Sequence, residues 1–326
     1  MPLILSSGMS IVAVLTRQDA AVRASLPAAR VLPDMQSLLA FQPLDLVIIA
    51  TPNHLHYAQA RAALEQGKHV VVDKPLALST LQADGLIETA ARRGCQLAVF
   101  QNRRWDSDFL TIQRIVAQQL LGTIVAFEAR WDRYRPAVAD RWRERTESGG
   151  GVLYDLGSHL IDQALCLFGM PDWLQAEVFT QRNGAVADDG FEIRLGKGNL
   201  RISLGVRSLA ADNSLRYRLH GLKASYRKIG LDVQEQQLRA GMLPFDAAFG
   251  VEPQDQWGRL VQGDGGGDSI VPAEVGRWRE FYNSMRRCIE EGAAGPVSAY
   301  EARRVLMIIE AARRSSADGT RIALSS

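Results

Sequence analysis

Short apolar runs alternate with stretches of helical spacing through the first hundred residues. Apolar strands that alternate with helices are typical of a parallel sheet covered by helices on both faces. Several of the helical stretches end at a glycine, such as Gly67 and Gly94, which is a common residue after a helix. The pattern predicts strands at 11–16, 29–32, 44–51, 69–73 and 96–100, and helices at 19–26, 34–41, 53–66 and 80–93.

From about Trp105 the pattern changes to longer strands separated by short turns, which favours an open, mainly antiparallel sheet. Because domains commonly have about 100–200 residues, we expect two: an α/β domain over 1–104 and an α+β domain over 105–326. The glycine-rich segment 263–268 is expected to be a surface loop, since no strand is predicted to lead into it. The second domain is predicted to have helices at 108–121, 153–168, 274–291 and 299–317, and strands at 123–131, 176–180, 191–195, 200–206, 215–221 and 224–229.

The composition is that of an ordinary globular protein. The chain has 326 residues, of which 47% are apolar and 23% charged, and a formal net charge of +2 without a long basic run. Nothing in it calls for a nucleic acid as partner, and no segment reaches the roughly 18 consecutive apolar residues of a membrane span. The first residues lack the pattern of a signal peptide, and Cys95, Cys166 and Cys288 form no CxxC pair. We expect buried, reduced thiols and a cytoplasmic location.

Two groups of residues carry candidate chemistry. Lys74 directly follows the strand HVVVD, at the carboxyl edge of a parallel sheet, where ligands bind in open α/β folds. Its ammonium could stabilise an alkoxide, although a surface lysine in a turn fits the pattern equally well. On a predicted helix, Asp155, His159 and Asp162 are spaced so that they share one face. A carboxylate beside an imidazole makes a competent base, but the exposed face of an amphipathic helix is the commoner explanation, and a metal site ranks last.

Polar residues also follow three other strands. Thr51 and Asn53 stand where the strand LDLVIIA ends, so Asn53 could contact a cofactor or cap the next helix. His56 fits the surface of that helix better than a ligand role, but it remains a candidate for cofactor binding. The candidates for substrate binding are Arg103, Arg104, Trp105 and Tyr134, together with Asp155 and His159. The guanidinium groups of arginine and a flat aromatic ring are suited to bind a polyhydroxylated substrate. The same residues would equally fit a salt-bridge cluster at a domain junction.

Taken in order, four segments resemble the Gfo/Idh/MocA oxidoreductase family, in particular its branch similar to scyllo-inositol dehydrogenase: TPNHLH, GKHVVVDKP, NRRWDSDF and GGGVLYDLGSHLIDQ. The resemblance implies hydride transfer between NADP or NAD and a sugar or inositol-like cyclic polyol. It further implies that His159 takes the hydroxyl proton, Asp155 orients His159 and Lys74 stabilises the alkoxide. A homodimer or homotetramer is also implied. The alternative is a ligand-sensing homologue without turnover.

The glycine-rich phosphate loop expected near the start of such a chain is absent from the sequence. Residues 2–7 resemble the end of the helix that follows this loop, and 11–16 resemble the second strand. We therefore expect a sheet that lacks its central first strand. A start codon assigned too late, a genuine truncation and replacement by another segment all remain open, and the first two are favoured. Thr16 and Arg17 end the second strand where NAD-preferring folds place an acid, which predicts a preference for NADP.

Overall fold

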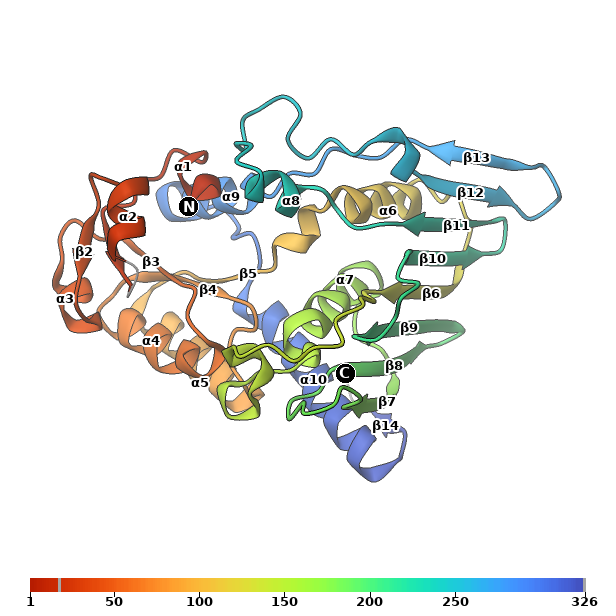
Figure 1. Ribbon diagram of the computed structural model, residues 1–326, viewed down its shortest axis with the longest axis horizontal. Helices are drawn as coiled ribbons and strands as arrows, with labels where there is room; N and C mark the ends of the chain where they lie inside the picture. Colours follow the sequence, from red (N-terminus) through yellow and green to blue (C-terminus); the bar gives the residue numbers. More distant parts are fainter. Residues whose placement is uncertain (17–18, 325–326) are drawn as a thin grey trace.

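The computed structural model describes residues 1–16 and 19–324. The first part of the chain alternates parallel strands with helices, as the apolar pattern predicts (Figure 1). Asp34 caps a helix as expected, since its side chain accepts a hydrogen bond from the backbone N–H of Ser37. The elements are α1 (Pro2–Leu5), β1 (Ala13–Leu15), α2 (Asp19–Ser25), β2 (Arg30–Leu32), α3 (Met35–Ala40), β3 (Leu46–Ile49), α4 (Asn53–Glu65), β4 (His69–Asp73), α5 (Thr80–Arg93) and β5 (Leu97–Phe100).

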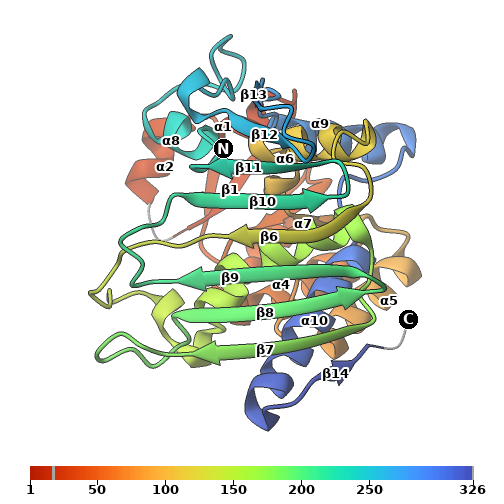
Figure 2. The same cartoon turned by 90° about the vertical axis from the view of Figure 1, so that its right-hand side faces the viewer.

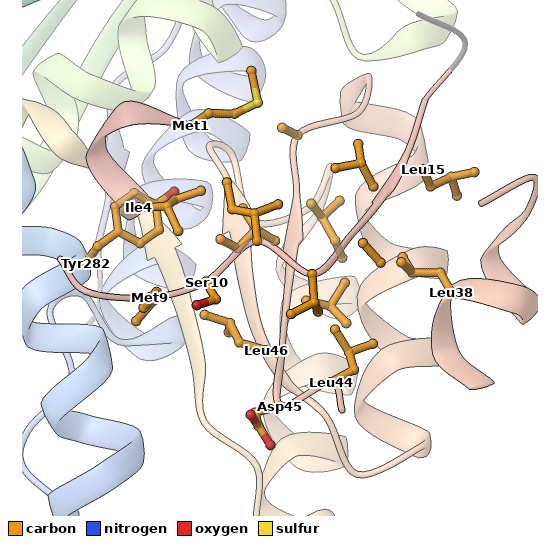
Figure 3. A pocket seen from close by; sticks show the side chains of 18 of the residues that line it. Met1, Ile4, Met9, Ser10, Leu15, Leu38, Leu44, Asp45, Leu46 and Tyr282 are labelled. Atoms are coloured by element: carbon orange, nitrogen blue, oxygen red, sulfur yellow. The ribbon is translucent and has the colours of Figure 1, made fainter. Parts of the chain in front are cut away.

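The parallel strands form two separate sheets. Among the residues that the structure describes, β1 pairs with β2 alone, whereas β3, β4 and β5 form a second sheet in that order. A cavity of about 900 Å³ lies between β1 and β3, and α1 and α9 (Arg279–Glu291) contribute to its lining. Figure 3 shows mainly apolar side chains around it, including Leu15, Leu46 and Tyr282. No strand among the described residues pairs with the facing edges of β1 and β3, which confirms the expectation of an interrupted sheet.

The second part of the chain contains a nine-stranded sheet in the described residues, with the order β13-β12-β11-β10-β6-β9-β8-β7-β14. All neighbouring strands are antiparallel except β6 and β9, which confirms the mainly antiparallel prediction. Helices lie behind the sheet, and Figure 2 shows its other face open. Its strands are β6 (Ile124–Arg130), β7 (Trp173–Phe179), β8 (Gly190–Lys197), β9 (Leu200–Arg207), β10 (Leu215–Gly221), β11 (Ala224–Ile229), β12 (Gly258–Gln262), β13 (Asp268–Val271) and β14 (Ile322–Ala323). Its helices, besides α9, are α6 (Ser107–Ala117), α7 (Ser158–Phe168), α8 (Gln234–Arg239) and α10 (Ala299–Asp318).

Alternation along the strands explains why only one face of this sheet is covered. Ile193 of β8 pairs with Leu204 of β9, and both side chains are buried. On the open face, Glu192 of β8 forms ion pairs with Arg130 of β6 and Arg207 of β9. A strand with a period of two therefore places its apolar residues against the helices and its charged residues on the opposite face.

Three local expectations are wrong. The segment 263–267 is the turn of a hairpin between β12 and β13, closed by a hydrogen bond from Gln262 N–H to the Gly267 carbonyl. The segment is exposed, as predicted for a surface loop, but the premise that no strand leads into it is wrong, since β12 does. That strand was not predicted because it carries too few apolar residues for a clear strand pattern. Helix α9 begins only at Arg279, since the backbone of Gly276 bonds to Gly250 instead of starting a helix. Cys166 is exposed, whereas Cys288 is buried as expected.

The C-terminal helices contact both halves of the molecule. Glu310 of α10 accepts hydrogen bonds from the backbone and hydroxyl of Thr80, at the start of α5. The backbone N–H of Val99 in β5 donates to the carbonyl of Val297, just before α10. These contacts hold the carboxyl edge of the parallel sheet β3-β4-β5 against the second domain, and the candidate site lies at this junction. The division of the chain at 104/105 remains a prediction.

Candidate active site

The loops after β3 and β4 are tied together by a buried histidine. His56 of α4 has Nδ1 2.8 Å from the Pro75 carbonyl oxygen and Nε2 2.9 Å from the Thr51 carbonyl oxygen. Both ring nitrogens therefore lie within hydrogen-bonding distance of backbone carbonyls in loops that line the site. His56 is fully buried, so the expectation that it lies on the helix surface is wrong. Its ring packs beneath the two loops and holds their backbones in place.

Asn53 does not cap its helix, contrary to one of the two sequence interpretations. Pro52 occupies the capping position without a side-chain bond, and α4 begins at Asn53. The Asn53 amide instead donates a 2.8 Å hydrogen bond to the carbonyl oxygen of Gly149. Thr51 donates its hydroxyl to the Gln59 amide oxygen at 2.7 Å. The two residues thus fix the loop after β3 and its contact with the second domain.

Lys74 and Asp155 form an ion pair across the junction. The Lys74 Nζ lies 2.9 Å from Asp155 Oδ1, and it also donates to the Asp155 backbone carbonyl. Burial raises the pKa of Asp155, but the positive charges of Lys74 and Arg143 outweigh this effect, and the pKa is about 2. The carboxylate is therefore ionised at neutral pH, and it holds the ammonium where the loop after β4 meets the second domain.

The glycine segment 149–151 packs closely against neighbouring backbone and side chains. A Cβ atom on Gly150 would lie 2.5 Å from the Arg143 carbonyl oxygen and 2.6 Å from that of Arg145. A Cβ on Gly151, whose φ is +102°, would collide with the Asp188 carboxylate. Glycine is required at both positions because backbone and carboxylate pack directly against them.

A π-helical turn, η4 (Leu153–Gly157), precedes α7 and changes the predicted spacing. The sequence places Asp155, His159 and Asp162 on one face of an α-helix. Because a π-turn is wider, residues four apart across it no longer align as they do in an α-helix. Asp155 bonds to Lys74 and Asp162 to Arg104, while His159 has a separate partner. His159 and Asp162 are also buried, so this side of the helix is not its solvated face.

His159 sits between an amide and an aromatic ring. Its Nδ1 lies 3.0 Å from Gln101 Oε1, and its ring centroid is 5.9 Å from that of Trp131, with the planes 31° apart. Burial, together with the positive charges of Lys74 and Arg103, lowers the pKa of His159 well below 6.5. The imidazole is therefore neutral at neutral pH and able to accept a proton.

A small polar cavity of about 140 Å³ opens beside the Lys74–Asp155 pair. Arg143 contributes to its wall, with Nε 3.6 Å from Asp155 Oδ1 and its guanidinium 4.5 Å from the centroid of Trp142. The full lining consists of Ala50, Thr51, Asn53, Asp73, Lys74, Trp142, Arg143 and Asp155. Residues from both domains thus meet around one polar space.

Three of the residues predicted to bind substrate are engaged within the protein. Arg103 is stacked between Trp131 and Trp278, each centroid 4.8 Å from its guanidinium carbon. Arg104 makes two hydrogen bonds of 2.7–2.8 Å to Asp162 and one of 2.7 Å to Glu301. Trp105 packs edge-on against Phe281 with a centroid distance of 6.0 Å. The geometry of the two arginines favours the alternative interpretation, a salt-bridge cluster at the domain junction.

The remaining candidates lie farther from these contacts or outside the description. Tyr134 is exposed and forms an isolated backbone bridge with Leu209. Thr16 directly follows β1, and Arg17 lies outside the described residues. Within the described ranges, no group of three or more His, Cys, Asp or Glu side chains is arranged to hold a metal ion. Across the same ranges, no helix combines the length and apolar character needed to cross a membrane.

Three residues of the site escaped the sequence analysis. Gln101 directly follows β5, and its partner His159 is 58 positions away, so nothing in the sequence pairs them. Trp142 and Arg143 lie in a segment of mixed charge, which by itself does not indicate a site. A tryptophan between arginines, shortly before a glycine run, is the signal that could have identified them as lining a polar site.

Comparison with known proteins agrees with this architecture. Two profiles match: "Oxidoreductase family, NAD-binding Rossmann fold" over residues 2–101 and "Oxidoreductase family, C-terminal alpha/beta domain" over residues 113–324. The chain belongs to the Gfo/Idh/MocA oxidoreductase family. It is 38% identical to scyllo-inositol 2-dehydrogenase (NADP⁺) of Bacillus subtilis over 313 residues, which cover 95% of this chain and 87% of that relative.

Two further comparisons extend the family assignment. A solved oxidoreductase structure from Bacillus subtilis superposes with a TM-score of 0.96 at 37% identity and covers 99% of this chain and 93% of the other. D-glucoside 3-dehydrogenase of Escherichia coli is 34% identical over 146 residues, or 44% of this chain and 41% of that relative. As a member of the Gfo/Idh/MocA family, the protein is a nicotinamide-dependent dehydrogenase that acts on a CH–OH group.

The site can be compared with the needs of a nicotinamide cofactor. At the carboxyl edge of β3 and β4, the small cavity offers a hydroxyl, an amide and a cation, which fit the polar groups of a nicotinamide and its ribose. The described residues contain no glycine-rich turn between a strand and a helix for the pyrophosphate. These residues therefore suit the nicotinamide end of the cofactor, where the reaction takes place.

Proposed function

We propose that the protein oxidises a secondary alcohol of a sugar or an inositol-like cyclic polyol. When bound, the nicotinamide would accept the hydride from the carbinol carbon, and the hydroxyl proton would pass to His159. The carbonyl compound would be the product. The observation that carries this proposal is the Lys74–Asp155 pair at the edge of the parallel sheet, together with the buried imidazole of His159, whose pKa the charge of Lys74 helps to lower.

Each residue has a distinct part in the proposed reaction. His159 would accept the proton, because its depressed pKa leaves it unprotonated at neutral pH. Lys74 would stabilise the negative charge that develops on the substrate oxygen. Asp155 would hold Lys74 in place, since it contacts that ammonium and is not in hydrogen-bonding contact with the His159 ring. This differs from the role that the family resemblance implies for Asp155.

We infer NADP as the preferred cofactor. The inference rests on Arg17, which follows β1 where an acid would favour NAD, and on the NADP dependence of the Bacillus subtilis relative. Thr16, Thr51, Asn53 and Lys74 would lie along the cofactor. Equal affinity for NAD and NADP, or unchanged NADP affinity after Arg17→Glu, would argue against it.

A homodimer or homotetramer through the open sheet face is part of the same proposal. The face is wide and carries paired charges such as Arg130–Glu192, which could be complemented by a second copy. Light scattering of the purified protein measures the assembly directly. A monomer at high concentration would rule it out.

Initial rates with a panel of inositols and sugars, each with NADP and with NAD, test the proposed activity. Lys74→Met should abolish most turnover, whereas Lys223→Met, at an exposed position on the hairpin between β10 and β11, should leave it unchanged. Turnover of the Lys74→Met variant at the wild-type rate would contradict the assigned role. An absence of turnover with every polyol would contradict the substrate class.

A further inference from the structure

The orientation of the Gln101 amide follows from one hydrogen bond and one longer polar contact. It is almost completely buried and directly follows β5. Its Nε2 lies 3.5 Å from the Ser158 carbonyl oxygen, and its Oε1 lies 3.0 Å from His159 Nδ1. A carbonyl oxygen can only accept, so the NH₂ group must face Ser158 and the amide oxygen must face the imidazole.

This orientation determines where His159 carries its proton. An amide oxygen accepts and cannot donate, so the hydrogen bond exists only if Nδ1 is protonated. A neutral imidazole has one N–H, which leaves Nε2 as the unprotonated nitrogen. The alternative tautomer would place two lone pairs against each other in a buried site.

The surroundings of the ring oppose a change in its orientation. Trp131 lies against the ring, and its own position is held by Arg103 and Arg216, whose guanidinium carbons are each 4.8 Å from the Trp131 centroid. Rotating the imidazole by half a turn would replace Nδ1 by a carbon at the Gln101 oxygen. The packing and the hydrogen bond therefore favour the same single arrangement.

We propose that Gln101 is the positioning residue that sets the tautomer of His159, so that Nε2 is always the atom that accepts the substrate proton. The inference rests on the proposed function in so far as His159 is the base. The Nδ1–H bond exists both before and after proton transfer, so Gln101 stays bonded throughout. An amide does this without a charge, whereas a carboxylate would stabilise the protonated ring, raise its pKa and leave less of it unprotonated at neutral pH.

Nitrogen NMR of ligand-free protein labelled with ¹⁵N-histidine tests the tautomer without any need for catalysis. The chain has five histidines, and the signals of His159 are those lost in His159→Asn. At neutral pH we expect protonated Nδ1 and unprotonated Nε2. Gln101→Leu should yield a tautomer mixture, and Gln101→Glu should retain Nδ1–H while raising the pH at which the ring titrates. A wild-type ring protonated on Nε2, or an unchanged spectrum in Gln101→Leu, would overturn the inference.

A matched control separates positioning from general destabilisation. Gln237 also uses both amide atoms, bonding to the Ala248 carbonyl at 3.0 Å and the Gly250 N–H at 2.7 Å. Gln237→Leu should leave the His159 signals unchanged. If Gln101→Leu does not fold, the isosteric Gln101→Glu still decides the question through its titration, because a ring that does not contact residue 101 would titrate as in wild type.

Kinetics connects the tautomer to turnover. In Gln101→Leu, kcat should fall by about tenfold or more while KM changes little, since the substrate still binds but the base is no longer in one form. A fixed tautomer in a protein that oxidises no polyol would refute the proposed function and leave the positioning role intact. A tautomer mixture in a fully active protein would refute the positioning role alone.

Discussion

Asp155 bonds to Lys74 and not to His159, although it stands four positions before the histidine in the chain. The π-turn η4, which precedes α7, separates the two side chains, so one reaches the loop after β4 and the other reaches Gln101 after β5. Asp155 and His159 lie close together in the chain, but they contact residues that follow two different strands of the parallel sheet. Asp155 therefore positions the ammonium of Lys74, and Gln101 positions the imidazole of His159.

Replacing the carboxylate tests this division of roles. We expect Asp155→Asn to lower kcat/KM by about tenfold to a hundredfold, since a hydrogen bond to a charged group contributes about 1.5–3 kcal/mol. The loss should come from a misplaced Lys74. The histidine NMR signals of the variant, recorded without ligand, should keep the wild-type tautomer. A change of tautomer in Asp155→Asn would instead support the role in which Asp155 orients His159.

The value of kcat/KM should fall on the acid side of the pH profile, as a single group becomes protonated. Because burial and the surrounding cations lower the pKa of His159 well below 6.5, kcat/KM should rise with pH below that value and be level through neutrality. Stability should follow the same direction. The unfolded chain binds a proton at about pH 6.5 and the folded chain does not, so the free energy of unfolding should decrease as pH falls below 6.5. A limb centred above pH 7 would contradict this assignment.

Lys74→Met should move this limb. The ammonium is one of the cations that lower the pKa of His159, so its removal should raise the pH at which the ring titrates. The His159 NMR titration measures this shift even in an inactive variant. An unchanged titration would show that the charge of Lys74 does not act on the imidazole.

Gly150 and Gly85 should respond oppositely to alanine. A Cβ on Gly150 meets two backbone carbonyls at 2.5–2.6 Å, and we expect Gly150→Ala to destabilise the protein by about 1–3 kcal/mol. Gly85 lies within α5 with only ordinary contact to Tyr57, so Gly85→Ala should stabilise by up to about 1 kcal/mol. Denaturant titrations measure both. Equal effects of the two substitutions would contradict the close approach at 149–151.

Much of the fold follows from the sequence because the parallel strands are continuous apolar runs. The run HVVV predicts β4, and the helices on either side are bounded by Gly67 and Gly94. The hairpin β12–β13 was missed because Arg259, Gln262 and Asp268 interrupt its apolar pattern. The interrupted sheet could be anticipated from the absence of a glycine-rich turn, and the separate pairings of β1 and β3 confirm it.

The site was predictable only in part. Lys74 was placed at the sheet edge by the strand before it, and the structure brings it to Asp155. The partners within the site could not be assigned, since an α-helical spacing was assumed where a π-turn occurs. Arg103 and Arg104 illustrate the same limit, because a sequence shows that arginines are present but not which carboxylates they face.

Turnover of scyllo-inositol with NADP by wild type and by His159→Asn tests the central claim most directly. His220→Asn, at an exposed position on β10, is the matched control, and NADPH fluorescence titration monitors binding separately. The account predicts that wild type and His220→Asn reduce NADP, whereas His159→Asn binds NADPH equally well but turns over about 10²–10⁴-fold more slowly. Wild-type rates in His159→Asn, or no NADP reduction by the wild-type protein, would contradict it.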